Sequence, residues 1–298
     1  MNAALVEEVK AWIADDPDPV TAAHLQGLLD AGDEAALKPL FNGFLQFGTA
    51  GLRGPIGAGP SCMNRAVVGR TAAGLAAYMK KRGMKSVVIG RDARYGSEDY
   101  TFESAEIFSG AGMDVYILPR PLPTPVLAFA TAHLKCDVGI MVTASHNPPQ
   151  DNGYKVYLGG SNGGSQITSP TDSLISDEIA HIAESRTFQE ISKSDDFKIL
   201  DEELFKSYVI AALEAAGGPA KNTRQTKIAY TPMHGVGLLT IKNLFHAAGF
   251  PELIVVESQA IPDGRFPTLA FPNPEEPGAM DEVFAIARES NANLAIAN

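Results

Sequence analysis

Residues 138–158 have the sequence VGIMVTASHNPPQDNGYKVYL, and the apolar run at the start of this stretch decides the fold. An apolar run that gives way to Ser, His, Asn and two prolines predicts a buried strand that ends in a polar loop. In open α/β sheets, ligands bind at the carboxyl ends of the strands. The loop offers a hydroxyl at Ser145, an imidazole at His146 and, further along, an ammonium at Lys155. We therefore interpret Ser145 as a nucleophile that carries a phosphoryl group.

Strands and helices alternate on both sides of this stretch. Apolar runs at residues 86–90 and 114–118 predict strands, and the segments that separate them have helical spacing of apolar residues. A second alternating unit begins near residue 201, with strands expected at residues 227–230, 253–257 and 294–297. Such alternation predicts an α/β fold: two successive α/β domains with mixed, mostly parallel sheets flanked by helices.

Three segments are expected along the chain. Residues 1–46 form an N-terminal helical extension, residues 47–198 the first domain and residues 199–298 the second domain. Within the extension, helices are expected at about residues 3–14, 20–29 and 34–45. Amphipathic helices of this kind most often serve packing, so we assign no chemistry to them.

A glycine-rich segment, FGTAGLRGPIG at residues 47–57, precedes the first long helix. So much glycine around one Thr and one Arg excludes a helix or a central strand. It fits a loop in which backbone N–H groups approach an anion, while Thr49 and Arg53 add side-chain donors. An ordinary surface turn explains the same glycines equally well.

Two further motifs end predicted strands. In GRDAR, residues 90–94, two arginines beside a carboxylate suit phosphate binding, but we favour a structural ion-pair network because Asp92 is placed to satisfy its neighbours. In TPMHGVG, residues 231–237, no second His or Cys stands at metal-ligand spacing from His234. We expect His234 to pack, or to line the domain boundary, rather than to bind a metal.

The overall composition limits the possible partners. The formal net charge of -11 argues against binding to nucleic acid or to an anionic membrane, both of which require a basic surface. No apolar stretch reaches the roughly 20 residues that span a bilayer, and the N-terminus lacks the apolar region of a signal peptide. A cytoplasmic location is therefore the default expectation. Cys62 and Cys136 form no CxxC pair and are expected to be free thiols in a reducing compartment.

Five motifs occur in one order along the chain: FGTAGLRG, GRDAR, TASHNPPQDNGYKVY, TPMHGVG and FPNPEEP. Together they resemble the α-D-phosphohexomutase superfamily, the phosphoglucomutases and phosphomannomutases. The wording of TASHNPPQDNGYKVY is most similar to the phosphoglucomutase-2-like, phosphopentomutase-related branch. The resemblance covers nearly the whole chain, but only the N-terminal portion of a family whose members have four domains.

The resemblance implies a phosphosugar mutase, an isomerase that moves a phosphoryl group between the 1- and 6-positions, or the 1- and 5-positions, of a sugar phosphate. The reaction passes through a phosphoserine, matching Ser145, and a bisphosphate intermediate such as glucose 1,6-bisphosphate, which is also the implied activator. His146 and Lys155 match residues beside the phosphoserine. Thr49 and Arg53 match residues that line the site.

The resemblance also implies Mg²⁺, held by the phosphate on Ser145 and by three aspartates of a loop expected just after Asn298. Because that loop and the sugar-reading loops of the family lie outside this chain, we expect an incomplete second domain and little or no mutase activity from the chain alone. An incomplete sheet leaves apolar surface uncovered, which predicts self-association. The alternative is a non-catalytic fragment that binds a sugar phosphate or a protein partner.

Phosphoryl transfer requires an in-line nucleophile, positive charge around the phosphoryl oxygens and a proton acceptor. Lys155, Arg53 and His146 offer positive charge or hydrogen bonds. A lysine among cations loses its proton more readily, so both Lys155 and His146 are candidates for the general base. Of the two we favour Lys155 as the base and His146 as a donor to the phosphoryl group. A Ser-His-Asp hydrolase is disfavoured because no G-x-S-x-G motif surrounds Ser145 and adjacent side chains in extended backbone point apart.

Overall fold

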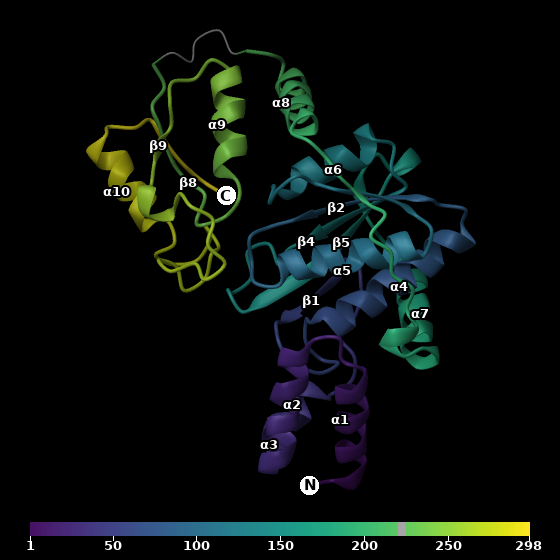
Figure 1. Cartoon of the computed structure of the whole chain (residues 1–298). Coiled ribbons are helices and arrows are strands. Elements are labelled where there is room, and N and C mark those ends of the chain that lie inside the picture. Colours follow the sequence, from purple (N-terminus) through teal and green to yellow (C-terminus); the bar gives the residue numbers. More distant parts are fainter. Residues whose placement is uncertain (220–224) are drawn as a thin grey trace.

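The structure, a computed structural model, describes residues 1–219 and 225–298 and contains two β-sheets (Figure 1). The larger sheet has the strand order β1-β5-β4-β2-β3-β7, with β6 paired to β5. Its strands are β1 (Leu52–Pro55), β2 (Ser86–Arg91), β3 (Asp114–Ile117), β4 (Val138–Val142), β5 (Asp151–Leu158), β6 (Ser165–Gln166) and β7 (Lys198–Ile199). The smaller sheet has the order β10-β8-β9. Its strands are β8 (Ile228–Thr231), β9 (Ile254–Val255) and β10 (Leu294–Ala297).

The strand β4, which begins the VGIMVTASHNPP stretch, lies in the middle of the larger sheet. It runs parallel to β2, which runs parallel to β3, and antiparallel to β5. Both pairings of the smaller sheet are parallel. The predicted mixed, mostly parallel α/β architecture is therefore confirmed. Because β5 returns beside β4, Lys155 lies opposite Met141, close to the loop that follows β4.

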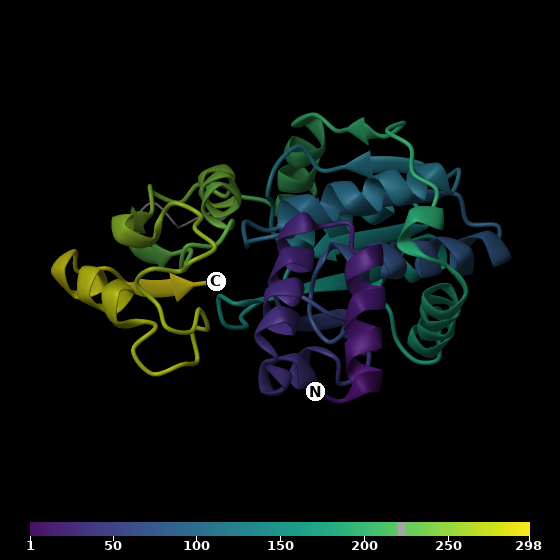
Figure 2. The same ribbon diagram turned by 60° about the horizontal axis from the view of Figure 1, so that its bottom comes forward.

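Helices cover both faces of the larger sheet (Figures 1 and 2). The helix α4 (Arg65–Lys81) packs with α5 (Ser97–Gly110) and with α7 (Thr171–Ser185), and their apolar side chains share one core with the sheet. On the opposite face, α6 (Thr124–His133) packs with α8 (Glu203–Ala215). Short 3₁₀-helices occur at η1 (Gly160–Asn162), η2 (Phe188–Glu190) and η3 (Glu257–Gln259).

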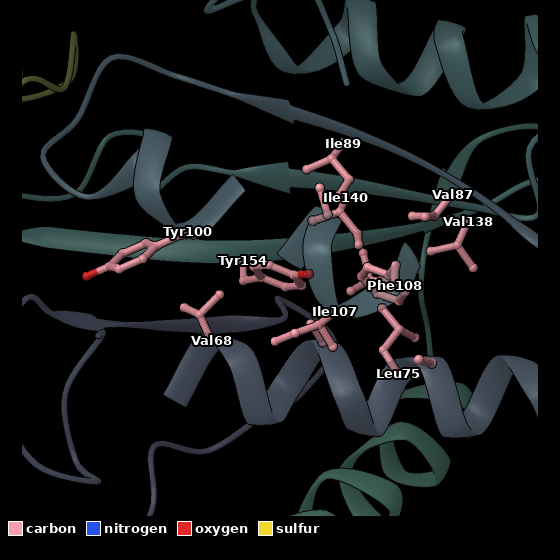
Figure 3. Close-up of a cluster of buried hydrophobic side chains, with 14 of the residues drawn as sticks. Val68, Leu75, Val87, Ile89, Tyr100, Ile107, Phe108, Val138, Ile140 and Tyr154 are labelled. Atoms are coloured by element: carbon pink, nitrogen blue, oxygen red, sulfur yellow. The ribbon is translucent and has the colours of Figure 1, made fainter. Parts of the chain in front are cut away.

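Side chains of β4 alternate between these two cores, as the period of a strand requires. Val138 and Ile140 point toward α4 and α5, where Figure 3 shows them near Phe108, whereas Met141 belongs to the core beneath α6. Every residue of β4 is buried. A strand covered on both faces is expected to be apolar throughout, and this is what allowed β4 to be predicted from its composition.

The helix α4 has the boundaries that its flanking residues predict. The side chain of Asn64 accepts from the Val67 N–H at 2.9 Å, which caps the first turn. At the other end, Gly83 has a φ of 71°, and the Met84 N–H donates to the Met79 carbonyl at 3.0 Å. This is the C-terminal motif that a glycine after the last turn permits.

The N-terminal helices α1 (Ala3–Asp15), α2 (Pro19–Ala31) and α3 (Glu34–Leu40) project from the lower side of the molecule in Figure 1. They share a small core of their own, which includes Val9, Leu25 and Leu37. The prediction that the third helix reaches residue 45 is wrong. The chain turns at Gly43, whose φ is 84°, and the Leu45 N–H donates to the Pro60 carbonyl at 2.9 Å instead of to a helical carbonyl.

The smaller sheet lies between α9 (Leu238–Ala247) and α10 (Asp281–Glu289) (Figure 1). The predicted domain boundary at residue 199 falls inside β7, which pairs with β3, and the Leu200 N–H still donates to the Ile117 carbonyl at 2.8 Å. We therefore propose that the first domain extends to residue 200. Within the described residues, no helix combines the length and apolar character that crossing a membrane requires.

A partly buried ion pair attaches the N-terminal helices to the first domain. Arg70 on α4 is buried and donates to Asp15 Oδ2 at 2.5 Å, while Asp15 Oδ1 accepts from the Phe188 N–H at 2.7 Å. The guanidinium of Arg70 also lies over the ring of Trp12, 4.8 Å from its centroid. One carboxylate thus joins three segments that are far apart in the sequence.

Replacing this carboxylate is expected to destabilise the fold. Asp15→Ala leaves the buried guanidinium of Arg70 without its partner, which we expect to lower the free energy of unfolding by about 2–4 kcal/mol. Lys10→Ala on the same helix removes only an exposed pair with Glu7 and should change it by less than about 0.5 kcal/mol. Urea unfolding of both variants measures the difference. Equal stabilities of the two variants would show that the pair does not attach the extension.

Candidate functional site

A cavity of about 320 Å³ lies between the loop after β4 and the loops of the second domain. Ser145, His146 and Lys155 line it from the first domain. The second domain contributes the loop after β8, which contains His234, and the segment around Phe266. The structure therefore brings the three residues predicted to be catalytic to one cavity at the carboxyl end of β4, where a ligand of an α/β sheet is expected.

The backbone turns sharply at Ser145, whose φ is 57°. For a residue other than glycine, this left-handed conformation costs roughly 1–2 kcal/mol and persists only where neighbouring groups hold it. The Ser145 N–H donates to Thr143 Oγ1 at 2.9 Å, and the Asn147 N–H donates to the Ala144 carbonyl at 3.1 Å. The strand β4 thus ends in a tight turn that places Ser145 at the cavity.

The turn brings Ser145 and His146 together. Ser145 Oγ lies 3.5 Å from His146 Nδ1, a separation at the long limit of a hydrogen bond. The expectation that these adjacent side chains point apart is wrong, because it assumed extended backbone and Ser145 has a positive φ. The geometry favours a role for the imidazole at the hydroxyl.

The guanidinium of Arg94 holds this loop in place through hydrogen bonds. Arg94 is only 4% exposed, and its Nη2 donates to the carbonyls of Ser145 at 2.9 Å and Asn147 at 2.7 Å. Its Nη1 donates to the carbonyls of Pro148 at 2.7 Å and Asp151 at 3.1 Å. One side chain therefore satisfies four carbonyl oxygens between the end of β4 and the start of β5.

Asp92 holds Arg94 in turn. Its Oδ1 accepts from the Arg94 N–H at 3.0 Å and from Ser97 Oγ at 2.7 Å, and its Oδ2 lies 3.4 Å from Arg94 Nε. The other arginine of the motif, Arg91, pairs with Glu98 at 2.6 Å. The interpretation of GRDAR as a structural ion-pair network is confirmed by these contacts.

The glycine-rich segment lies against β5. Gly51 has a φ of 77°, and a Cβ there would approach the Tyr154 carbonyl oxygen to 1.9 Å, so no other residue permits this packing. Arg53, on β1, donates from Nη1 to Asn147 Oδ1 at 3.1 Å and thereby reaches the loop after β4. Thr49 is exposed and does not line the cavity, and its predicted contact with substrate stays a prediction.

Positive charge gathers around Ser145. Burial lowers the pKa of Lys155, and the nearby charge of Arg53 lowers it further. Burial likewise lowers the pKa of His146, with additional effects of the charges of Lys155 and Arg94. Among the residues that the structure describes, the Lys155 ammonium makes no hydrogen bond or ion pair. The charges of Asp92 and Glu275 act in the opposite direction on Lys155 and His146, but the pKa of both groups is still lowered, and such an environment favours an anionic ligand.

The loop after β8 supplies the opposite wall of the cavity. His234 is 3% exposed, its Nε2 lies 3.0 Å from Thr268 Oγ1, and its N–H donates to the Gln259 carbonyl at 2.9 Å. The expectation that His234 packs at the domain boundary and lines it is confirmed. No pattern in the sequence indicated Gly264 or Phe266, which line the same cavity from a segment without regular secondary structure.

Strained backbone concentrates at this cavity. In the described part of the chain, positive φ occurs at six residues other than glycine. Four of them line the cavity: Ser145, Met233, His234 and Phe266. Such residues persist where the surrounding structure holds them and are frequent at active sites, so their clustering supports a functional site here.

The described residues do not form a magnesium site by themselves. Residues 1–219 and 225–298 contain no group of three His, Cys, Asp or Glu side chains that is arranged to hold a metal ion. The carboxylates nearest the loop already have hydrogen-bond partners. Asp92 accepts from the Arg94 N–H, and Asp151 accepts from Asn147 Nδ2 at 2.8 Å. The predicted coordination of Mg²⁺ through a phosphate on Ser145 stays a prediction.

The chain matches two family models and many named proteins. The models describe phosphoglucomutase/phosphomannomutase alpha/beta/alpha domains I and II and match residues 45–186 and 206–298. A protein of Haemophilus influenzae named "Probable phosphomannomutase" is 46% identical over 79% of this chain and 48% of its own length. A phosphopentomutase of Mus musculus is 34% identical over 100% of this chain and 50% of its own.

A solved structure shares the fold. The crystal structure of a phosphoglucomutase/phosphomannomutase family protein from Burkholderia thailandensis matches with a TM-score of 0.68 at 25% identity. The match covers 84% of this chain and 51% of that one. The chain thus spans about half the length of the curated relatives that it matches.

The pKa of His146 provides a test of the cationic cavity. We expect it below the ordinary value of about 6.5, because burial and the charge of Lys155 disfavour the protonated ring. Lys155→Met should raise this pKa, whereas Lys38→Met on α3 should leave it unchanged. NMR titration of the imidazole measures both.

The same shift predicts a pH dependence of stability. Since the folded-state pKa is depressed, the contribution of a neutral His146 to the free energy of unfolding is present above pH of about 6.5 and is lost as the pH falls through the folded-state pKa.

In the NMR titration, a His146 pKa that is insensitive to Lys155→Met would contradict the proposed electrostatics.

Proposed function

The chain belongs to the phosphoglucomutase/phosphomannomutase family, and from this we propose that it forms the part of a phosphosugar mutase that carries the phosphoryl group on Ser145. The single observation that supports the proposal most strongly is the setting of that hydroxyl. Ser145 lies in a strained turn at the carboxyl end of β4, in a cavity that His146 and Lys155 also line. The positive charge around it suits a phosphate.

The proposed chemistry is a reversible transfer of a phosphoryl group. Ser145 Oγ forms a bond to one phosphorus of a sugar bisphosphate as the bond between that phosphorus and its sugar oxygen breaks. The serine proton passes to a base and from the base to the leaving sugar oxygen, which yields a sugar monophosphate. In the reverse step a hydroxyl of a sugar monophosphate attacks this phosphorus as the bond from Ser145 Oγ breaks, and the hydroxyl proton passes through the base to Ser145 Oγ. The bisphosphate that forms then returns its other phosphoryl group to Ser145, so the remaining phosphate stands at a different position of the sugar. We propose a sugar bisphosphate such as glucose 1,6-bisphosphate as the donor that first phosphorylates Ser145.

We propose His146 as the proton acceptor and Lys155 as the cation that faces the phosphoryl group, which reverses the roles favoured from the sequence. The lowered pKa of His146 keeps its ring neutral near pH 7, so Nδ1 can accept a proton from Ser145 Oγ, 3.5 Å away. Such contacts commonly shorten when substrate binds. Lys155 has no hydrogen-bond partner in the described residues, which leaves its ammonium available to a phosphate.

Phosphorylation of Ser145 is measurable without a complete mutase reaction. Incubation with glucose 1,6-bisphosphate should place a phosphate on Ser145, detected by mass spectrometry of the intact chain and its peptides. Ser145→Ala should take up none, whereas Ser165→Ala, at an exposed serine on β6, should behave as the unaltered chain does. Uptake by Ser145→Ala at the unaltered rate would refute the proposal.

The two roles are separable by charge-preserving substitution. His146→Gln removes the acceptor and should slow phosphorylation by about 10²-fold or more. Lys155→Arg keeps the positive charge but does not accept a proton, so it should retain much more of the rate than Lys155→Met. If Lys155→Arg proves as slow as Lys155→Met while His146→Gln remains fast, the assignment from the sequence is the correct one.

Self-association remains a further proposal. Phe284 on α10 and Leu294 on the edge strand β10 are 43% and 51% exposed. Burial of such side chains between two copies is favourable. Light scattering should show an apparent mass that rises with concentration. Phe284→Glu should suppress the rise, and Val20→Glu, at an exposed valine on α2, should not.

A further inference from the structure

We propose that Arg94 is a positioning residue that couples the backbone of Ser145 to the seating of the second domain. The coupling itself follows from contacts in the structure, and its effect on phosphorylation rests on the function proposed above. The partner of Arg94 in the second domain is the turn at residues 263–266. The two domains are therefore in contact through the side chain of Arg94.

The first half of the coupling is the set of hydrogen bonds from Arg94 to the loop after β4. The planar guanidinium directs four donor contacts to carbonyl oxygens of residues 145–151, including that of Ser145 itself at 2.9 Å. A lysine has three donors on one nitrogen and does not reproduce this arrangement. Because the Ser145 N–H is held by Thr143, the Arg94 contact to the Ser145 carbonyl fixes the other side of the same residue. The left-handed φ of Ser145 is thus held at both of its peptide groups.

The second half is the packing of the turn at residues 263–266 on Arg94. The guanidinium carbon lies 4.9 Å from the centroid of the Phe266 ring, within the range of a cation–π contact. Gly264 lies directly against the backbone of residues 93–95. A Cβ on Gly264 would come within 2.9 Å of the Ala93 carbonyl oxygen and 3.0 Å of Arg94 Cα.

The turn is itself tied to the opposite wall of the cavity. The Phe266 N–H donates to the Asp263 carbonyl at 3.0 Å, and the Asp263 N–H donates to the His234 carbonyl at 3.0 Å. Phe266 and His234 both have positive φ. A shift of the loop after β8 would therefore move this turn and change its contact with Arg94.

The two halves act through one guanidinium. Its nitrogen atoms donate to the Ser145 loop, while the ring of Phe266 covers it. When the second domain is seated, Phe266 excludes water from these hydrogen bonds, and exclusion of water strengthens them. When the second domain moves away, water competes for the four carbonyls, and the strained turn at Ser145 loses its support. Seating of the second domain thus orients the nucleophile.

The test alters only the second-domain side of the contact. Gly264→Ala places a methyl group against the backbone of Arg94, whereas Gly27→Ala on α2 meets no atom within 4 Å and serves as the control. Hydrogen–deuterium exchange of the full chain should show amides of residues 144–151 exchanging about fivefold faster or more in Gly264→Ala, and unchanged in Gly27→Ala. Arg94→Lys should have the same effect on residues 144–151 and should also increase exchange at residues 263–266.

Two results would overturn the coupling. One is unchanged exchange of residues 144–151 in Gly264→Ala, which would show that Arg94 holds the loop independently of the second domain. The other is an equal increase throughout α4 and β2, which would show general destabilisation instead of coupling. Both are read without any enzymatic activity.

Phosphorylation by glucose 1,6-bisphosphate provides a separate readout for the catalytic consequence. In Gly264→Ala the rate at saturating bisphosphate should fall by about tenfold, while the half-saturating concentration changes by less than about threefold, because the nucleophile and not the binding surface is displaced. A change confined to the half-saturating concentration would overturn the orienting role. If the unaltered chain takes up no phosphate, the proposed function fails, and the exchange measurements still decide the coupling.

Discussion

One buried guanidinium holds the loop on which the site depends. Arg94 donates to four carbonyl oxygens of the turn between β4 and β5, and Asp92 holds it in place. A turn of this length between two buried strands leaves carbonyl groups that neither strand satisfies, and an unsatisfied buried carbonyl is costly. Supplying the donors from the loop after the neighbouring strand lets the chain adopt a positive φ at Ser145 without glycine. The conformation of the candidate nucleophile is therefore a consequence of hydrogen bonding from the loop after β2.

The second constraint is electrostatic. The chain has a formal net charge of -11, yet the side chains around Ser145 are cationic and lie close enough to lower the pKa of both Lys155 and His146. Burial is the larger cause of both shifts, since it removes the water that would stabilise the charged forms. In such a cavity an anionic ligand is stabilised, because its negative charge offsets the positive charges of the side chains. Local charge, not the total, therefore indicates the ligand class.

The cavity belongs to neither domain alone. Its floor comes from the larger sheet, and its opposite wall comes from the loop after β8 and the turn that contains Phe266. Residues with strained backbone occur on both sides, at Ser145 and at His234 and Phe266. Strain of this kind is maintained by surrounding contacts, and one of them, between the Phe266 ring and the Arg94 guanidinium, crosses between the domains. The geometry of the site is consequently sensitive to how the domains are seated.

The sequence by itself determined the α/β class, most element positions and the cluster of Ser145, His146 and Lys155, because apolar periodicity and the abrupt change to polar residues after β4 are local signals. It also indicated the structural role of Asp92. It did not determine the end of α3, where the chain leaves the helix to bond to Pro60, or the approach of His146 to Ser145. Only the tertiary structure showed that Arg94 contacts both the nucleophile loop and Phe266. Those contacts join residues more than fifty positions apart, and the pairing of distant segments is decided by sheet order and domain packing, which no local pattern encodes.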